Sequence, residues 1–244
     1  TDIANGSVDA TREYEQYNLS FIYTHKFNKN AQLDFKADRM ETNTDDNSLQ
    51  RYEYIGSDHT GYDHWNKEKN LIHPVRLDFT QKFENLNGKL TAGAKAAWLT
   101  NKNNTDYITW LNGEQNNTTS YTDLYNYKEN VYALYAKYAL TFKKLSIDFG
   151  VRMEHTQVSP ESFSNPERNY EGDYTDFFPE VGLNYTINQE KGHNINLSYS
   201  RNIIRPYMEY LNPLIRRTGE YSYSTGNPLL DADYYHTLIL TGVL

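Results

Sequence analysis

Two aspartate–histidine pairs lie close together in the sequence and could bind a metal ion. Asp58 precedes His59 and Asp63 precedes His64, and imidazole nitrogens with carboxylate oxygens bind several transition metals. No regular pattern of neighbouring residues would fix the spacing of these four side chains, so we favour a solvated loop. The stretch Asp45-Asp46-Asn47 is similar to the start of a calcium-binding loop but lacks its glycine and distal glutamate. We therefore predict no metal site and no cofactor.

A histidine and two serines are the candidates for hydrolytic chemistry. A serine nucleophile needs a histidine and a carboxylate in fixed positions, and His73, Ser198 and Ser200 could supply the first two. Nothing in the sequence brings these residues together. Neither a Gly-x-Ser-x-Gly motif nor a phosphate-binding loop occurs. We therefore predict that the chain is not an enzyme.

The composition excludes several classes of protein. The absence of cysteine in 244 residues excludes disulfides and thiolate metal sites, and the net charge of -8 argues against a nucleic-acid partner. No apolar run approaches the ~20 residues of a spanning helix, but a spanning strand needs only ~9–11 residues with one apolar face. The 23 tyrosines favour β structure and membrane interfaces.

Alternating apolar and polar residues predict the strands that must position these side chains. The segments with this period of two are 17–24, 33–37, 71–83, 90–98, 132–142, 145–153, 181–187, 195–199 and 234–240. We therefore predict an all-β fold, an antiparallel up-and-down meander of about 8–10 strands. Ten charged residues on the polar faces are expected to line the interior: Asp34, Lys36, Asp38, Arg76, Asp78, Lys95, Asp148, Arg152, Glu154 and Glu180.

The connections between these segments alternate strictly between short and long. The short ones are 28–30, 84–88, 143–144 and 188–193, and the long ones are 41–69, 101–127, 155–176 and 204–232. Outer-membrane barrels alternate in this way, with short periplasmic turns and long extracellular loops. Aromatic residues near the short connections, where a periplasmic girdle belongs, are Phe27, Phe83, Phe142 and Tyr185. The alternative is a soluble antiparallel barrel with a tyrosine-rich surface.

Four blocks of sequence resemble a known family in the same order. Three of them lie at 77–95, 132–154 and 177–185. The fourth and most specific block contains Arg205-Pro206, Leu211-Asn212-Pro213 and Gly226-Asn227-Pro228. Together they are similar to the barrel of TonB-dependent receptors, in the outer-membrane β-barrel family.

The resemblance implies a role in the outer membrane of a Gram-negative cell. Such receptors import a nutrient, for example a siderophore or glycan, with energy passed through TonB to a plug domain inside the barrel. They have roughly 22 strands, so residues 1–244 are expected to be a mid-barrel piece without plug or C-terminal strands. The implied partners are outer-membrane lipid, the plug, TonB and the nutrient. The alternatives are a soluble or surface-exposed all-β ligand-binding module and a hydrolase on a barrel wall.

Ligand contacts are expected in the long loops. Aromatic faces stack on sugars and flat chelates, so the candidates are Tyr62, Trp65, Tyr107, Trp110 and Tyr170. Arg201, Arg216 and Arg217 could contact an anionic ligand or lipopolysaccharide, and their roles stay open. For Arg205 we favour a structural role, in which the side chain holds loop backbone at a strand exit.

Overall fold

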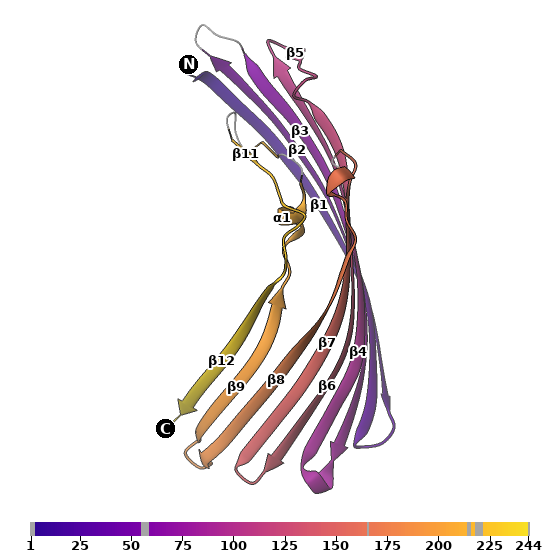
Figure 1. The fold of residues 1–244 in the computed structure, drawn as a ribbon, viewed down its shortest axis with the longest axis vertical. Coiled ribbons are helices and arrows are strands. Elements are labelled where there is room, and N and C mark those ends of the chain that lie inside the picture. The colour runs from indigo at the N-terminus through magenta and orange to yellow at the C-terminus, as the bar shows by residue number, and fades with distance from the viewer. Residues whose placement is uncertain (1–2, 55–58, 165, 214–215, 218–221, 244) are drawn as a thin grey trace.

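The computed structural model describes residues 3–54, 59–164, 166–213, 216–217 and 222–243. Within them lies a 10-stranded antiparallel sheet, in which the long strands follow one another as a meander and form one curved wall (Figure 1). These strands are β1 (Ile3–Lys26), β2 (Ala31–Tyr54), β3 (Thr60–Phe83), β4 (Gly88–Leu111), β6 (Tyr121–Phe142), β7 (Leu145–Ser162), β8 (Gly172–Asn188), β9 (His193–Ile204) and β12 (Asp233–Val243). The predicted all-β meander is confirmed.

The remaining elements are short. They are β5 (Glu114–Gln115), which pairs with β4, the two-stranded sheet of β10 (Arg216–Arg217) and β11 (Tyr223–Ser224), the 3-10 helices η1 (Glu84–Leu86) and η2 (Pro166–Arg168), and the helix α1 (Met208–Leu211). Among the described residues, no helix is both long and apolar enough to cross a membrane. The sheet therefore determines the architecture.

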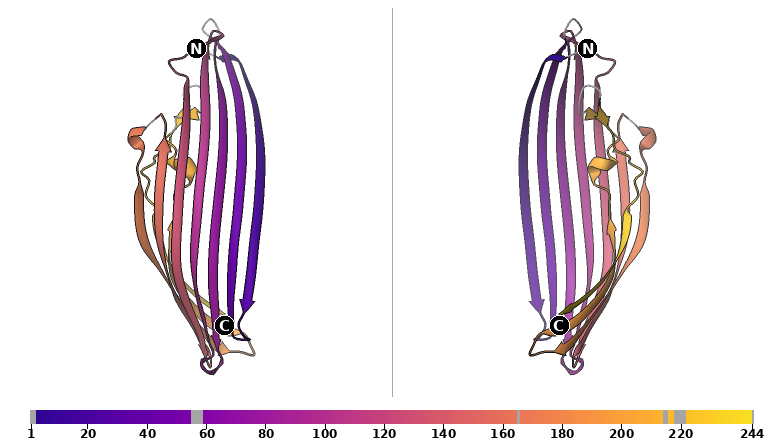
Figure 2. Two further views of the ribbon diagram at one scale, coloured as in Figure 1. Left: turned by 90° about the vertical axis from the view of Figure 1, so that its right-hand side faces the viewer. Right: turned by 90° about the vertical axis from the view of Figure 1, so that its left-hand side faces the viewer.

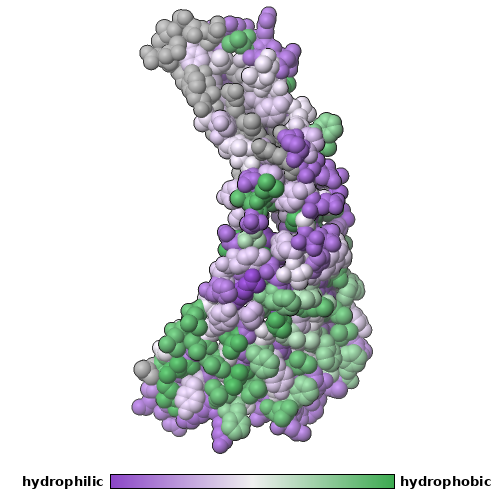
Figure 3. Space-filling view, viewed as in Figure 1, coloured by the Kyte–Doolittle hydropathy of each residue, from purple (hydrophilic) through white to green (hydrophobic). Residues whose placement is uncertain are grey.

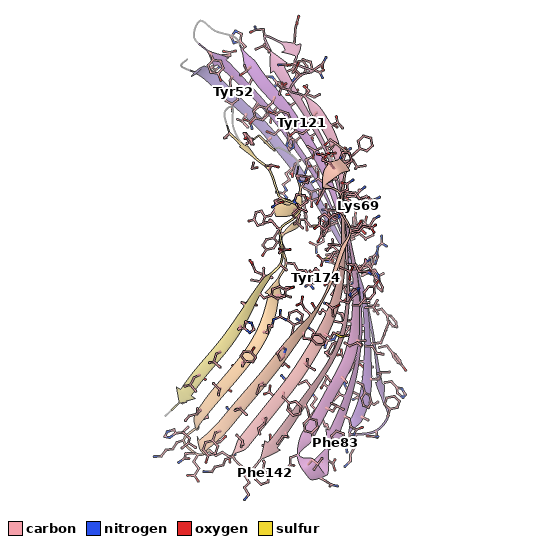
Figure 4. The ribbon with its side chains drawn as sticks, viewed as in Figure 1. Tyr52, Lys69, Phe83, Tyr121, Phe142 and Tyr174 are labelled. Carbon is pink, nitrogen blue, oxygen red and sulfur yellow. The ribbon has the colours of Figure 1, made fainter. Side chains whose placement is uncertain are left out.

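The four predicted short connections all lie at one end of the sheet, which we call the turn end (Figure 1). The tightest joins β6 to β7 through Lys143 and Lys144 alone. Asn87 and Lys143 adopt positive φ angles of 44° and 54°, as tight turns require. The two aromatic residues Phe83 and Phe142 lie at this end, as predicted (Figure 4).

Three of the four predicted long loops are wrong. The stretches 41–69, 101–127 and 155–176 are mostly strand, because β2, β3, β4, β6, β7 and β8 continue far beyond the segments with an apolar face. Figure 2 shows the length of these strands side by side. Both faces of their outer halves carry mostly polar and tyrosine side chains, so the period of two that marks a half-buried strand is missing there. Only the connection 205–232 remains long, and part of it lies outside the described residues.

The two faces of the wall differ in character. The described part of the connection 205–232 folds against the inside of the curve (Figure 1), where Leu211 packs on Tyr125 and Tyr127 of β6. We call this side the concave face and the other side the convex face. The register places all ten charged residues predicted to line the interior on the concave face, for example Lys36 opposite Arg76 and Arg76 opposite Lys95.

Apolar side chains cover the turn-end half of the convex face (Figure 3). One register row on this face reads Leu140, Ile147, Leu183, Leu197 and Leu240 across five strands. The apolar cover ends at Trp98 and Tyr132, whose side chains touch through a 3.3 Å hydrogen bond. Tyr132 precedes Phe142 by ten residues, which at ~3.3 Å per residue and a tilt of ~40° is about 25 Å across the membrane. This is the height of the apolar band of an outer-membrane barrel.

Candidate functional site

Charged residues in the turn-end half of the concave face neutralise one another across strands. Lys137 on β6 lies 3.1 Å from Asp148 on β7 and 3.0 Å from Glu180 on β8. The two carboxylates fill the space over glycines: a Cβ at Gly150 would meet Glu180, and one at Gly182 would meet Asp148. Glycine within a strand often marks such a close approach. This half of the wall therefore presents paired charges to the interior.

A second paired group lies closer to β3. The Arg76 guanidinium is 2.6 Å from Asp78 and donates a 2.9 Å hydrogen bond to the Tyr135 hydroxyl, which in turn donates to Asp78. The Tyr135 ring covers Gly93, because a Cβ there would lie 2.6 Å from the ring. Arg76 and Asp78 were predicted for the interior, whereas Tyr135 was missed because only charged residues were assigned to it.

Arg205 forms the central node of the concave face. Its guanidinium donates to Glu154 at 2.8 Å and to Thr156 at 2.9 Å, and it lies 3.8 Å from Glu129. A further hydrogen bond reaches the Tyr174 hydroxyl at 3.2 Å. Burial alone would lower the pKa of Arg205, but the bond to Glu154 and the nearby anionic groups raise it above its ordinary value. Arg205 is therefore a fixed cation that ties β6, β7 and β8 to the exit of β9.

The structure places Arg205 at the exit of β9, where its hydrogen-bond partners differ from those expected. We expected Arg205 to hold loop backbone, and its hydrogen bonds instead go to side chains of neighbouring strands. Glu129, Thr156 and Tyr174 belong to stretches predicted as strand edge or loop, so no sequence pattern marked them. Figure 4 shows Tyr174 pointing into the hollow of the curve.

The connection that follows Arg205 packs onto the concave face above this node. Leu211 is 4% exposed against Tyr125 and Tyr127, and the Tyr125 hydroxyl donates to the Leu211 carbonyl. Burial, together with Glu129, raises the pKa of Tyr127 above its ordinary value. The Tyr170 hydroxyl donates a 2.7 Å hydrogen bond to the Pro228 carbonyl. The described part of the connection therefore lies against the concave face instead of extending away from the wall.

The Asn-Pro and Gly-Asn-Pro motifs lie against each other inside this connection. Gly226 donates its backbone N–H to the Asn212 carbonyl at 2.9 Å, and Asn227 donates to the Tyr210 carbonyl at 2.6 Å. A side chain at position 226 would meet both of those carbonyl oxygens. Thr225 also donates to the Pro213 carbonyl at 2.9 Å. The motif residues therefore fold the connection back on itself, and glycine is required by the close backbone approach.

Near the other end of the sheet, which we call the loop end, tyrosines stack on the concave face. Tyr107 lies between Tyr62 and Tyr121, with ring centroids 5.3 Å and 5.1 Å apart, and Tyr52 continues the row at 6.4 Å from Tyr62 (Figure 4). Tyr107 is 1% exposed and Tyr62 is 4% exposed. The stack is thus a packed layer that holds the four long strands β2, β3, β4 and β6 together.

The five predicted ligand contacts do not gather in one place, and four of them lie on strands instead of loops. Tyr62 and Tyr107 are in the buried stack on the concave face. Trp65 and Trp110 alternate with them along β3 and β4 and therefore lie on the convex face. There Trp110 donates a 2.8 Å hydrogen bond to Asp63. Tyr170 alone lies in a connection, held by Pro228.

The candidate metal and hydrolytic residues are also separated. Asp63 and His64 point to opposite faces as neighbours on β3, and Asp63 pairs with Arg51 at 2.5 Å. Asp58 lies outside the described residues, as do the side chains of Arg216 and Arg217. The described part of the chain contains no group of three His, Asp or Glu side chains that could hold a metal. His73 opposes Trp98 on the convex face, whereas Ser198 and Ser200 lie on the concave face, so they cannot meet.

Comparison with known proteins places this wall in a family. Residues 24–242 match the outer membrane protein beta-barrel family. The ferric citrate transporter FecA in its unliganded form has 11% identity and a TM-score of 0.58, over 80% of this chain and 28% of that chain. The RagAB peptide importer in its closed-closed state has 14% identity and a TM-score of 0.59, over 96% and 28%. The copper transporter OprC has 9% identity and a TM-score of 0.55, over 93% and 42%.

These identities establish a shared fold only, and the chain spans less than half of each of those structures. No curated protein sequence matches it. The family match, however, covers most of the chain and agrees with the apolar convex face and the polar concave face. The predicted family and location are therefore confirmed: the chain belongs to the outer membrane protein beta-barrel family and forms part of the wall of a large barrel in the outer membrane of a Gram-negative cell.

Proposed function

We propose that this chain is one arc of the wall of a TonB-dependent outer-membrane transporter that imports a nutrient. The observation that carries the proposal is the concave face. It presents paired charges along the membrane-spanning half, and a long connection folds inward over it beside Arg205. A barrel packed solid by apolar side chains needs no such face, whereas a wall around a polar interior does.

The other components of the transporter are proposed from the resemblance and the fold. A plug domain would contact the charge pairs of the concave face, and TonB would act on that plug. The matched structures include transporters of ferric citrate, peptide and copper. This range supports import as the general activity and leaves the nutrient open among siderophores, glycans and similar solutes. A soluble binding module is disfavoured by the apolar convex face.

The experiment uses the full-length protein in cells that lack their own copy. Cells are supplied in turn with labelled ferric siderophores and oligosaccharides at limiting concentration, and accumulation is measured with and without TonB. We expect saturable uptake of one of these solutes that disappears when TonB is deleted. Equal uptake without TonB would indicate a passive pore, and binding without any uptake would indicate a receptor or binding module. Either result would overturn the proposal.

A further inference from the structure

Three lysines lie together on the convex face, just beyond its apolar cover. Lys69 on β3 and Lys102 on β4 are direct partners in the register, and Lys128 on β6 is the diagonal neighbour of Lys102, because Lys102 pairs with Asn126. All three side chains are exposed. Like charges directly opposite each other destabilise a sheet, so this arrangement needs a compensating anion.

Among the described residues, an anion is supplied to only one of the three lysines, Lys69. Glu41 lies 2.5 Å from Lys69, and Arg39 shares the same carboxylate at 2.7 Å. Within the described part of the chain, neither Lys102 nor Lys128 forms an ion pair.

The immediate neighbours of Lys102 on the convex face include no carboxylate. They follow from the register and are Lys67, Lys69, Leu71, Thr100, Asn104, Leu124, Asn126 and Lys128. Lys67 is already paired with Asp45 at 3.1 Å. Acidic side chains Glu13 and Glu15 lie on β1, so the surplus of positive charge is confined to β4 and β6. On the far side, Glu161 opposes Asn126 and is therefore the diagonal neighbour of Lys128, so Lys102 is the lysine without an adjacent carboxylate.

The Cα positions of the patch lie just beyond the layer of lipid headgroups, within reach of a lysine side chain. Lys102 follows Trp98 by four residues, and Lys128 precedes Tyr132 by four. Four residues rise ~13 Å along a strand, or about 10 Å along the membrane normal at a tilt of ~40°. The headgroup layer extends roughly 5–8 Å beyond the hydrocarbon, and a lysine side chain can bend back toward it.

We propose that Lys102 and Lys128, with Lys69 beside them, bind a phosphate group of an outer-leaflet glycolipid whose acyl chains lie on the apolar convex face below. Two lysine ammonium groups can donate to one phosphate, and the acyl chains replace water on the row below. Lys102 and Lys128 have no ion-pair partner among the described residues. Lys137 on the concave face, in contrast, is neutralised by two carboxylates. The proposed site is independent of the transported nutrient.

The test measures lipid binding to the purified full-length protein by native mass spectrometry, with titration of diphosphorylated lipid A. The double variant Lys102→Gln/Lys128→Gln is compared with Lys95→Gln, which lies on the same strand but on the concave face. We expect the double variant to bind about 30-fold more weakly, at about a factor of five for each lysine near an anionic headgroup. Lys95→Gln should bind as the unchanged protein does.

Three further measurements test whether the charge and the phosphate group are needed for binding. Lys102→Arg/Lys128→Arg keeps both charges and should retain the lipid, even if the glutamine variant folds poorly. The unchanged protein should bind phosphate-free lipid A at least tenfold more weakly. Equal binding of phosphate-free lipid would show an acyl-chain contact only. Displacement of the lipid by inorganic phosphate at millimolar concentration would show a free anion site. Both results would overturn the proposal.

Discussion

Substitution of Val151 by arginine tests the lipid-facing surface most sharply. Val151 lies on the convex face of β7, 48% exposed, between Ala136 and Pro179 in the register. Val151 is six residues after Leu145, which lies at the turn end. It is four residues before His155, which pairs with Tyr132 in the register. It is therefore close to the middle of the apolar band.

The depth of the site sets the size of the effect. Arginine at the midplane of an outer-membrane barrel lowers the free energy of unfolding by ~2–4 kcal/mol, and near the interface by only ~0–1 kcal/mol. Phe142, 65% exposed beside the Lys143-Lys144 turn, provides the interfacial control. Phe142→Arg keeps a cation at the rim, where the guanidinium can reach water.

The assay is equilibrium unfolding in guanidinium chloride of the full-length protein folded into phospholipid vesicles. We expect Val151→Arg to reduce the free energy of unfolding by about 3 kcal/mol and Phe142→Arg by less than ~1 kcal/mol. Equal losses at both positions, or no loss at Val151, would mean that the convex face does not contact lipid. The assignment of the two faces would then be wrong.

Three further predictions concern the node, the connection and the rim. Arg205→Ala removes the closer of the two cations that pair with the buried Glu154 carboxylate and leaves Arg152 at 3.3 Å, so we expect a loss of ~1–3 kcal/mol and faster proteolysis of 205–232; unchanged proteolysis would contradict the anchoring role. Gly226→Ala should release the same connection at a cost of ~1–3 kcal/mol, because its Cβ meets the carbonyls of Tyr210 and Asn212, while Gly6→Ala, with ordinary contacts, should not. Hydrogen bonds from Lys69 and Arg39 lower the pKa of Glu41, so its stabilising effect is present above the unfolded pKa and is lost as pH falls through the folded pKa. Glu41→Gln should therefore lower stability at pH 7, and its effect should disappear as the pH falls through the folded pKa of Glu41; an effect that does not change with pH would refute the pairing.

The sequence predicts the turn-end half of the wall well, because lipid on one side and a polar interior on the other impose the period of two. The short connections and the row from Leu140 to Leu240 follow from it. The loop-end half has water on both sides, so residues such as Asn43, Lys69 and Asn103 look like a loop while pairing as strands. Register alone shows that Lys69 and Lys102 are partners.

The candidate site was only partly predictable for a related reason. Arg205 and the Gly226 motif were found through the resemblance, but their partners come from distant strands. The five aromatic residues were assigned to three long loops, but four of them lie on strands and are divided between the two faces of the wall. Their role as ligand contacts stays a prediction. Tyr62 and Tyr107 were thereby separated from Trp65 and Trp110.

The division of the wall into a lipid face and an interior face can be measured directly. Because the chain has no cysteine, Val151→Cys and Thr91→Cys can each carry a single fluorophore, in a full-length protein without other cysteines. The two positions lie at similar depth, Val151 on the convex face and Thr91 on the concave face. Vesicles with brominated acyl chains should quench the fluorophore at position 151 and leave that at position 91 unaffected. Quenching at 91 and not at 151 would contradict the account.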